Sequence, residues 1–127
     1  MSTPDDRRYS ETHEWYLLQG DTLTIGLTQY AVNELTDITF VEMKEVGTNV
    51  EAGEEVGEVE SVKTTSDVYT ACPGEIIEVN DKLSDDPSLL NNDPFGEGWL
   101  VKLKVSDTSP LDELLDAAAY DQKFPLN

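Results

Sequence analysis

The chain has 127 residues and a formal net charge of −19, from 27 acidic and 8 basic side chains. Because such a surface repels nucleic acids and anionic membranes, we expect neither as a partner. No apolar run approaches the roughly 18 residues of a membrane span, and residues 1–15 lack the apolar core of a secretory signal. We therefore expect a cytoplasmic, monomeric protein with a single domain over residues 1–127.

The acidic residues are spread over the whole chain rather than gathered in a tail. The apolar fraction of 38% and the two tryptophans argue against a disordered acidic polymer. An excess of acids with few lysines is expected of a protein kept soluble in concentrated salt, where charge repulsion is screened. The composition therefore suggests a halophilic source, but it says nothing about activity.

The first third of the chain predicts a β-hairpin followed by a short helix. Two apolar runs flank the turn at 19–21, and the second run alternates so that three residues face one side: Leu23, Ile25 and Leu27. Thr28 is a suitable N-cap for a helix whose apolar residues repeat at helical spacing: Ala31, Leu35 and Ile38. Residues 38–43 then return to a strand pattern.

Residues 54–79 predict a second hairpin. Gly57 and the β-branched content oppose a helix there. We expect three segments in order: a strand up to Val62, a turn over residues 63–66 and a returning strand from Asp67. Pro73 and Gly74 fit the two central positions of a type II turn, after which another strand begins.

The remaining segments predict a loop, a strand and a helix. Residues 84–98 are dense in turn residues, which predicts a long surface loop. Residues 99–105 alternate and place four side chains on one face: Trp99, Val101, Leu103 and Val105. A C-terminal helix is expected from Ser109 as cap and Pro110 at its first position, with an apolar stripe of Leu111, Leu114, Leu115 and Ala118. Many short strands with two peripheral helices predict a mainly β barrel or sandwich.

The chain lacks the usual catalytic constellations. His13 is the only histidine, which excludes histidine-based metal clusters, and no nucleophile elbow accompanies it. There is no phosphate-binding glycine loop and no calcium loop. The lone Cys72 cannot form an internal disulfide and is expected to be a small buried hydrophobe. With 27 acids, adjacent carboxylates arise by chance, so we expect neither catalytic residues nor a metal.

Lys63 is the only basic residue from Glu45 to Asp81, a stretch with ten acidic residues. Composition alone favours a surface ion pair with Glu60 or Asp67. A Schiff-base lysine needs a desolvated site, which a turn between acidic strands does not provide. The third interpretation is an attachment point, since a long side chain at a hairpin tip would carry a cofactor into solvent. A carrier needs no catalytic residues of its own.

The segment VGEVESVKTTSDVYTACPGEIIEVN, residues 56–80, resembles the lipoyl-attachment segment of the glycine cleavage system H protein family. That family typically reads G-x-V-E-S-V-K-x-x-S-D around the modified lysine. Other segments resemble the family in family order: THEW, IGLTQYAVNELTDITFVEM, LNNDPFGEGWLVKLK and ELLDAAAY. The chain departs from the pattern in having Pro73 directly before Gly74, with Cys72 beside it.

The resemblance implies a mainly β, lipoyl-domain-like barrel-sandwich hybrid with short peripheral helices, including a C-terminal helix. It implies that Lys63 bears lipoate in a covalent amide linkage. The implied partners are a pyridoxal-phosphate glycine decarboxylase (P protein), which loads an aminomethyl group, and a tetrahydrofolate-dependent aminomethyltransferase (T protein), which removes it and releases ammonia. A flavin dihydrolipoamide dehydrogenase (L protein) reoxidises the dithiol, and a lipoate ligase or lipoyl transferase attaches the group.

The resemblance also implies roles for individual residues around the lysine. The amine of the loaded arm would be cationic and would favour carboxylates. The candidate contacts are Glu14 and Asp67, with Thr12 as a hydroxyl acceptor. Recognition by the lipoylating enzyme is assigned to three further residues: Glu60, Gly47 and Gly74.

Three other functions compete with this one. A biotin carrier usually has methionines on both sides of its lysine, whereas Val62 and Thr64 flank Lys63. A related lipoate carrier could serve sulfur oxidation or relay lipoyl groups to other enzymes. An unmodified β-barrel interaction module would carry nothing on Lys63. Intact mass separates that last alternative from the carriers.

Overall fold

The computed structural model describes residues 4–125. Its strands are β1 (Arg8–Tyr9), β2 (Glu14–Gln19), β3 (Thr22–Leu27), β4 (Ile38–Met43), β5 (Asn49–Val50), β6 (Glu55–Ser61), β7 (Thr65–Tyr69), β8 (Gly74–Val79) and β9 (Val101–Val105). Its helices are α1 (Gln29–Leu35), α2 (Lys82–Asp85), α3 (Ser88–Asn92) and α4 (Ala117–Lys123), with a 3₁₀ turn at Ser109–Glu113. Within the described residues, none of these helices is long and apolar enough to cross a membrane.

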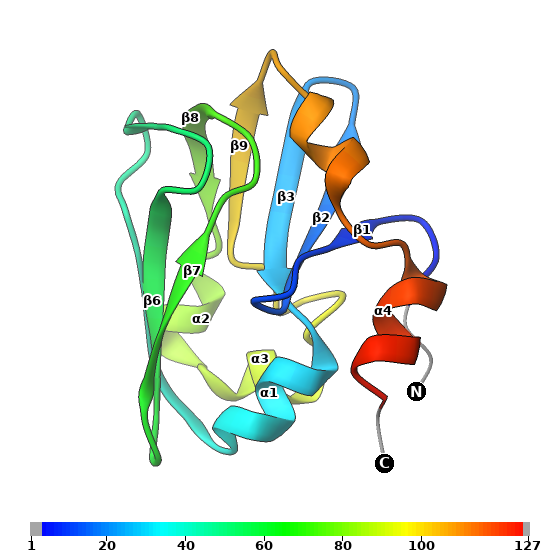
Figure 1. Cartoon of the computed structure of the whole chain (residues 1–127). Coiled ribbons are helices and arrows are strands. Elements are labelled where there is room, and N and C mark those ends of the chain that lie inside the picture. The colour runs from blue at the N-terminus through cyan, green and yellow to red at the C-terminus, as the bar shows by residue number, and fades with distance from the viewer. Residues whose placement is uncertain (1–3, 126–127) are drawn as a thin grey trace.

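The strands form two antiparallel sheets, one in the order β1-β2-β3-β9-β8-β5 and one in the order β4-β6-β7. The sheets face each other without closing into a barrel, and α1, α2 and α3 lie at the end of the molecule that carries the β6–β7 turn (Figure 1). This arrangement confirms the predicted mainly β, lipoyl-domain-like barrel-sandwich architecture.

The main core lies between the two sheets. The predicted inward face of β3 is buried, and it packs with residues of both sheets: Leu23, Ile25, Leu27, Val41, Val56, Val59, Val68, Ile76, Val101 and Leu103. Cys72 is buried in the same core, as expected. The alternation of apolar residues along each strand therefore determines which face of each sheet turns inward.

The early secondary-structure predictions are confirmed. The hairpin of β2 and β3 turns at Gly20, with Gln19 paired to Thr22. Thr28 is the N-cap of α1, and its hydroxyl accepts a hydrogen bond from the N–H of Ala31 at 3.2 Å. The lysine hairpin also forms, with β7 beginning at Thr65 rather than at the predicted Asp67.

Five other predictions are wrong. The segment predicted as a long loop contains α3 and the last two residues of α2, and the buried Leu83 and Leu90 anchor these two helices on the core. The C-terminal helix is interrupted because the backbone N–H of Leu115 donates to the carbonyl oxygen of Tyr9 at 3.0 Å, so α4 starts only at Ala117. Its start is capped by Asp116 instead of Ser109.

The type II turn at Pro73-Gly74 is also absent. Gly74 is not among the glycines with positive φ, because it begins β8 and pairs with Val50 and Val105. Trp99 was predicted to share the inward face of the following strand. It instead precedes β9 and packs with a separate aromatic cluster.

This aromatic cluster attaches the C-terminal segment to the outer part of the large sheet. Tyr9, Trp15 and Tyr120 are buried, and the rings of Tyr9 and Tyr120 stack at 5.1 Å between centroids. Phe95 and Phe124 pack against them. The cluster holds α4 beside β1, although the two elements lie near opposite ends of the chain (Figure 1).

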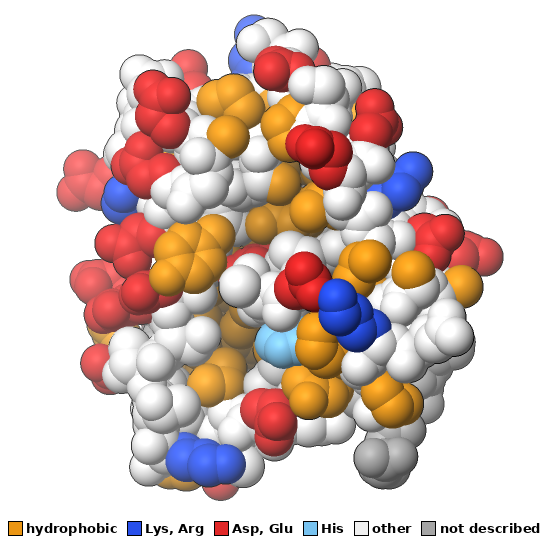
Figure 2. Space-filling view, in the orientation of Figure 1, with side chains coloured by type: hydrophobic (Ala, Val, Ile, Leu, Met, Phe, Trp, Pro, Cys, Tyr) orange, Lys and Arg blue, Asp and Glu red, His pale blue; other side chains and the backbone are white. Residues whose placement is uncertain are grey.

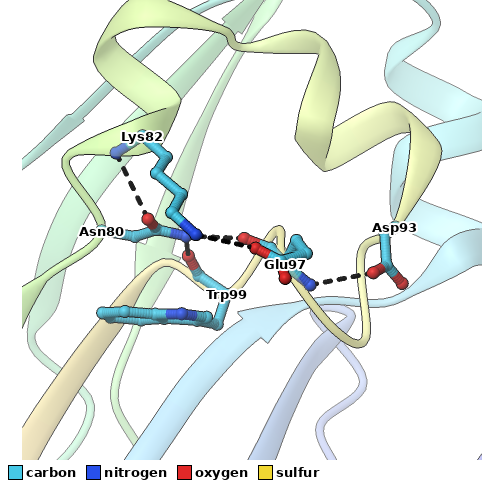
Figure 3. A network of polar contacts seen from close by, with 5 residues as sticks. All are labelled: Asn80, Lys82, Asp93, Glu97 and Trp99. Carbon is cyan, nitrogen blue, oxygen red and sulfur yellow. Dashed lines mark hydrogen bonds and ion pairs between the residues drawn. The ribbon is translucent and has the colours of Figure 1, made fainter.

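A polar network closes the segment that contains α2 and α3 (Figure 3). The buried Asn80 donates to the carbonyl oxygens of Glu97 at 2.7 Å and Trp99 at 2.8 Å. Lys82 forms an ion pair with the Glu97 carboxylate at 3.0 Å, and the backbone N–H of Glu97 donates to Asp93 at 2.9 Å. These contacts tie the two ends of the segment together and fix where α3 lies.

Gly26→Ala should destabilise the protein by about 1–3 kcal/mol. A Cβ at this position of β3 would lie 2.4 Å from the Cε2 and Cζ2 atoms of the buried Trp15 ring. Urea unfolding gives the free energy of each variant. Trp15→Phe makes room for the methyl group, so the double variant should lose less than the sum of the two single losses. Strictly additive losses would contradict the steric explanation.

Candidate functional site

The turn between β6 and β7 presents Lys63 to solvent. The Ser61 hydroxyl shapes the turn, since it accepts hydrogen bonds from the backbone N–H groups of Lys63 at 3.1 Å and Thr64 at 3.0 Å. The backbone of Ser61 also donates to the carbonyl oxygen of Thr64 at 2.8 Å. Val62, Lys63 and Thr64 are all exposed. The lysine therefore lies on a short, hydrogen-bonded turn.

Within residues 4–125, the lysine side chain is not held by an acidic partner. Its Nζ donates to the backbone carbonyl oxygen of Glu34, at the end of α1, at 3.4 Å. Among residues 4–125, neither Glu60 nor Asp67 lies within ion-pairing distance of Nζ. The ion pair that composition favoured is therefore absent from the described residues.

The edge of the molecule along β6 and β7 is strongly acidic (Figure 2). Figure 2 shows carboxylates gathered along the edge of the molecule formed by β6 and β7. Glu60 lies on β6, where it pairs with Thr65 across the hairpin. Asp67 is exposed on β7, opposite Glu58. A partner that binds this edge must therefore accommodate negative charge.

Glu14 occupies a buried polar pocket at the start of β2. Its side chain is fully buried. One carboxylate oxygen accepts hydrogen bonds from the Ser10 hydroxyl at 2.5 Å and from the Thr12 hydroxyl, and the other accepts the Tyr69 N–H at 3.1 Å. Burial raises the pKa of this carboxyl, and these three donors partly offset the effect. Glu14 is thus a fully buried residue at the start of β2 rather than a solvated one.

Tyr69 connects the predicted residues Glu14 and Asp67. Its backbone N–H donates to Glu14, and its hydroxyl donates to Asp67 at 3.4 Å. The phenol is about a third exposed, at 36%. Tyr69 was not predicted, because β7 and β2 belong to different sheets and only the packing of the two sheets brings them together. Thr12 belongs to the same group, but its hydroxyl donates to Glu14.

The two glycines assigned to lipoylation recognition lie away from the lysine turn. Gly47 has φ of 95° and donates to the carbonyl oxygen of Ile76 at 2.7 Å. Gly74 begins β8 at the end of the molecule opposite the β6–β7 turn (Figure 1). A Cβ on Gly74 would lie 2.5 Å from the carbonyl oxygen of Lys104. Both glycines therefore have a local structural reason to be there.

His13 anchors the C-terminal helix next to the Glu14 pocket. Its Nδ1 lies 2.8 Å from the hydroxyl of Tyr120, which is 2.7 Å from the hydroxyl of Thr28. The imidazole also packs against Tyr30 and Phe124, with centroid distances of 4.6 and 4.7 Å. Burial lowers the pKa of His13 below its ordinary value of 6.5, while the nearby Glu34 charge raises it.

This lowered pKa predicts that acidification below 6.5 destabilises the protein through His13. The unfolded chain binds a proton there at higher pH than the folded chain, so stability rises with pH across that window. His13→Gln removes the group that titrates, so the variant should lack the part of the pH dependence that comes from His13. Between pH 7.5 and pH 5.5 the wild type should therefore lose more stability than the variant. Urea unfolding at constant salt measures it. Parallel pH dependences of the two proteins would contradict the prediction.

Comparisons with known proteins agree with this geometry. The family model described as "Glycine cleavage H-protein" matches residues 7–125. The glycine cleavage system H protein of Thermus thermophilus is 53% identical over 122 residues, which cover 96% of this chain and 95% of that protein. The H protein of Symbiobacterium thermophilum is 48% identical over 120 residues, 94% of each chain.

A solved structure has the same fold along nearly the whole chain. The crystal structure of a glycine cleavage system H protein from Mycobacterium marinum superposes with a TM-score of 0.88 at 41% sequence identity, covering 98% of this chain and 100% of that chain. The family match, the sequence identities and this structural similarity all cover the lysine hairpin and both sheets. The chain belongs to the glycine cleavage H-protein family.

Proposed function

We propose that the chain is the lipoyl-carrying subunit of a glycine cleavage system, with lipoate in amide linkage to Nζ of Lys63. The observation that carries the proposal is the position of Lys63: exposed at the tip of the β6–β7 turn and, among the described residues, without a carboxylate partner. The turn fits the group, because an extended arm on Nζ meets solvent rather than a packed core. When attached, the lipoyl group supplies a disulfide that accepts electrons and the one-carbon amine unit.

The chain's own residues position and shelter the arm, and partner enzymes supply the chemistry. Those partners are the glycine decarboxylase, the aminomethyltransferase, the dihydrolipoamide dehydrogenase and the lipoate ligase or lipoyl transferase. Membership of the family supports these assignments. The alternative role in sulfur oxidation or lipoyl relay is less well supported, because the relatives are named for the glycine cleavage system.

We assign shelter of the loaded arm to Glu14, with Asp67 and Thr12 beside it. The buried Glu14 carboxylate accepts two hydroxyl donors, from Ser10 and Thr12. A cationic amine in place of a neutral hydroxyl donor would add the attraction between opposite charges to the hydrogen bond with the carboxylate. Asp67 is exposed on β7, accepts a hydrogen bond from the Tyr69 hydroxyl and would add negative charge near Glu14.

Recognition by the lipoylating enzyme is assigned to Glu60, the predicted recognition residue on the lysine hairpin itself. It is partly exposed on β6, three positions before the lysine. Gly47 and Gly74 lie away from Lys63 (Figure 1). Gly47 would therefore contribute only by shaping its turn, and Gly74 only by shaping the start of β8.

The proposed function is tested by reconstitution. The full chain is lipoylated in vitro and combined with glycine decarboxylase, aminomethyltransferase and dihydrolipoamide dehydrogenase. Ammonia release from glycine should depend on the lipoylated chain, and the unmodified chain should not support it. Equal rates with the two forms would refute a lipoyl-dependent carrier role.

A further inference from the structure

Asn91 on α3 bridges two backbone groups at the junction between α1 and β4. Its Nδ2 donates to the carbonyl oxygen of Thr36 at 2.6 Å, and its Oδ1 accepts the backbone N–H of Ile38 at 3.0 Å. Both ends of the amide are used, and the two bonds lie on either side of Asp37. A side chain from one helix thus fixes the path of the chain as it leaves another helix and enters a strand.

This junction needs an external support because its backbone is strained. Thr36 is the C-cap of α1 with φ of 65° and ψ of −135°, a backbone conformation that residues other than glycine rarely adopt. The pairing of β4 with β6 is also irregular here, with a register shift between Ile38 and Phe40. Neither the helix nor the sheet ladder alone therefore determines where Asp37 lies.

The same junction supports the turn that carries Lys63. The carbonyl oxygen of Asp37 accepts the backbone N–H of Val62 at 3.1 Å, and Ile38 pairs with Ser61. The carbonyl oxygen of Glu34, two residues before Thr36, accepts the Lys63 Nζ at 3.4 Å. A continuous set of contacts therefore leads from Asn91 through Asp37 to the residue next to the lysine.

The helix that carries Asn91 is itself well fixed. The network of Asn80, Lys82, Asp93 and Glu97 ties the chain on both sides of α3 (Figure 3). The buried Leu90 anchors α3 on the core. Asn91 therefore projects from a well-fixed helix toward the strained segment at residues 36–38. A side chain can position a neighbouring segment only when its own position is fixed in this way.

We propose that Asn91 is a positioning residue for lipoylation. By clamping residues 36–38, it holds the Val62–Lys63 backbone in the orientation in which the lipoylating enzyme receives the lysine amine. The inference rests on the proposed function of Lys63. Asn91 contacts neither the lysine nor the arm, and it acts through Asp37 and Val62.

The first test measures the junction without any enzyme. In Asn91→Ala, amide hydrogen exchange at Val62 should be about tenfold faster than in wild type, as expected from the loss of hydrogen-bond support. Amides of the central sheet, such as those of Ile25 and Leu103, should keep their protection. Asn92→Ala is the matched control, because Asn92 is the exposed neighbour on the same helix. A uniform loss of protection, with no additional effect at Val62, would overturn the inference.

The second test measures lipoylation. The full chain is incubated with lipoate, ATP and lipoate ligase, and intact mass follows the modified fraction over time. Asn91→Ala should be modified about tenfold more slowly at limiting enzyme, to the same final extent, and Asn92→Ala at the wild-type rate. Thr36→Gly removes the strain at the C-cap, so adding it to Asn91→Ala should restore part of the rate.

A second variant covers the case in which Asn91→Ala does not fold. Asn91→Asp preserves the volume and the acceptor for Ile38 but places a carboxylate oxygen against the Thr36 carbonyl, so it should also be slow. If Asn91→Ala and Asn91→Asp were both lipoylated at the wild-type rate, and hydrogen exchange at the Val62 amide were unchanged, the positioning role would be overturned. If the wild-type chain itself is never modified on Lys63, the proposed function fails instead.

Discussion

Lys63→Arg should abolish glycine-dependent ammonia release by the reconstituted system while leaving the fold intact. The guanidinium cannot accept the lipoyl group in an amide linkage, so the variant carries nothing between the partner enzymes. The side chain is exposed and donates only a long hydrogen bond, at 3.4 Å, to the Glu34 carbonyl. The free energy of unfolding should therefore change by no more than about 0.5 kcal/mol. Ammonia release and urea unfolding measure the two effects separately.

Lys44→Arg is the matched control. Lys44 follows β4 and forms an ion pair with Glu54 at 3.0 Å, which an arginine can maintain. This variant should retain wild-type carrier activity. Carrier activity in Lys63→Arg equal to that of the control would show that Lys63 is not the attachment residue, whatever its position on the turn.

Glu14→Ala should release ammonia from the loaded carrier at least about tenfold faster than wild type. The proposed charge-assisted bond between the buried carboxylate and the arm's amine has a typical strength of about 1.5–3 kcal/mol, and its loss exposes the amine to water. The protein is loaded with glycine and decarboxylase, the enzyme is removed, and ammonia is followed without the aminomethyltransferase. Equal release rates in the two proteins would contradict the shelter role.

Two further variants make the Glu14 experiment specific. Glu14→Gln keeps the volume and an acceptor for the Ser10 and Thr12 hydroxyls but removes the charge, so it should also release ammonia quickly. Glu75→Ala removes an exposed carboxylate from β8 and should behave like wild type. An effect of equal size in Glu75→Ala would point to overall charge rather than to the buried pocket.

The strands and the lysine turn could be predicted because local patterns determine them. The alternation of Leu23, Ile25 and Leu27 identifies the buried face of β3, and Thr28 marks the start of α1. The helices α2 and α3 were missed because each has only four or five residues, and the segment around them is rich in Asp, Asn and Pro. Short helices of this kind depend on the burial of Leu83 and Leu90, which local propensity does not reveal.

Most of the site contacts could not be predicted, because they join residues far apart in the chain. The bond from the Tyr69 N–H to Glu14 depends on how β7 lies against the start of β2. The two bonds of Asn91 depend on where α3 lies relative to Thr36 and Ile38. The sequence identified the lysine and the family pattern around it. The supporting contacts required the three-dimensional arrangement.

The arrangement is consistent with the proposed carrier role. The two sheets build a rigid body, the β6–β7 turn presents one lysine beyond it, and the buried Glu14 carboxylate lies within reach of the same hairpin through Tyr69. In the proposed function, the chain contributes position and charge, and the lipoyl group and the partner enzymes would contribute the reactivity.

The most direct test of the central claim is the mass of the Lys63 peptide from protein purified from its native host. A peptide heavier than the unmodified one by the mass of a lipoyl amide, with fragment ions that place the added mass on Lys63, is the predicted result. An unmodified Lys63 peptide in a protein isolated from cells that are actively degrading glycine would contradict the account.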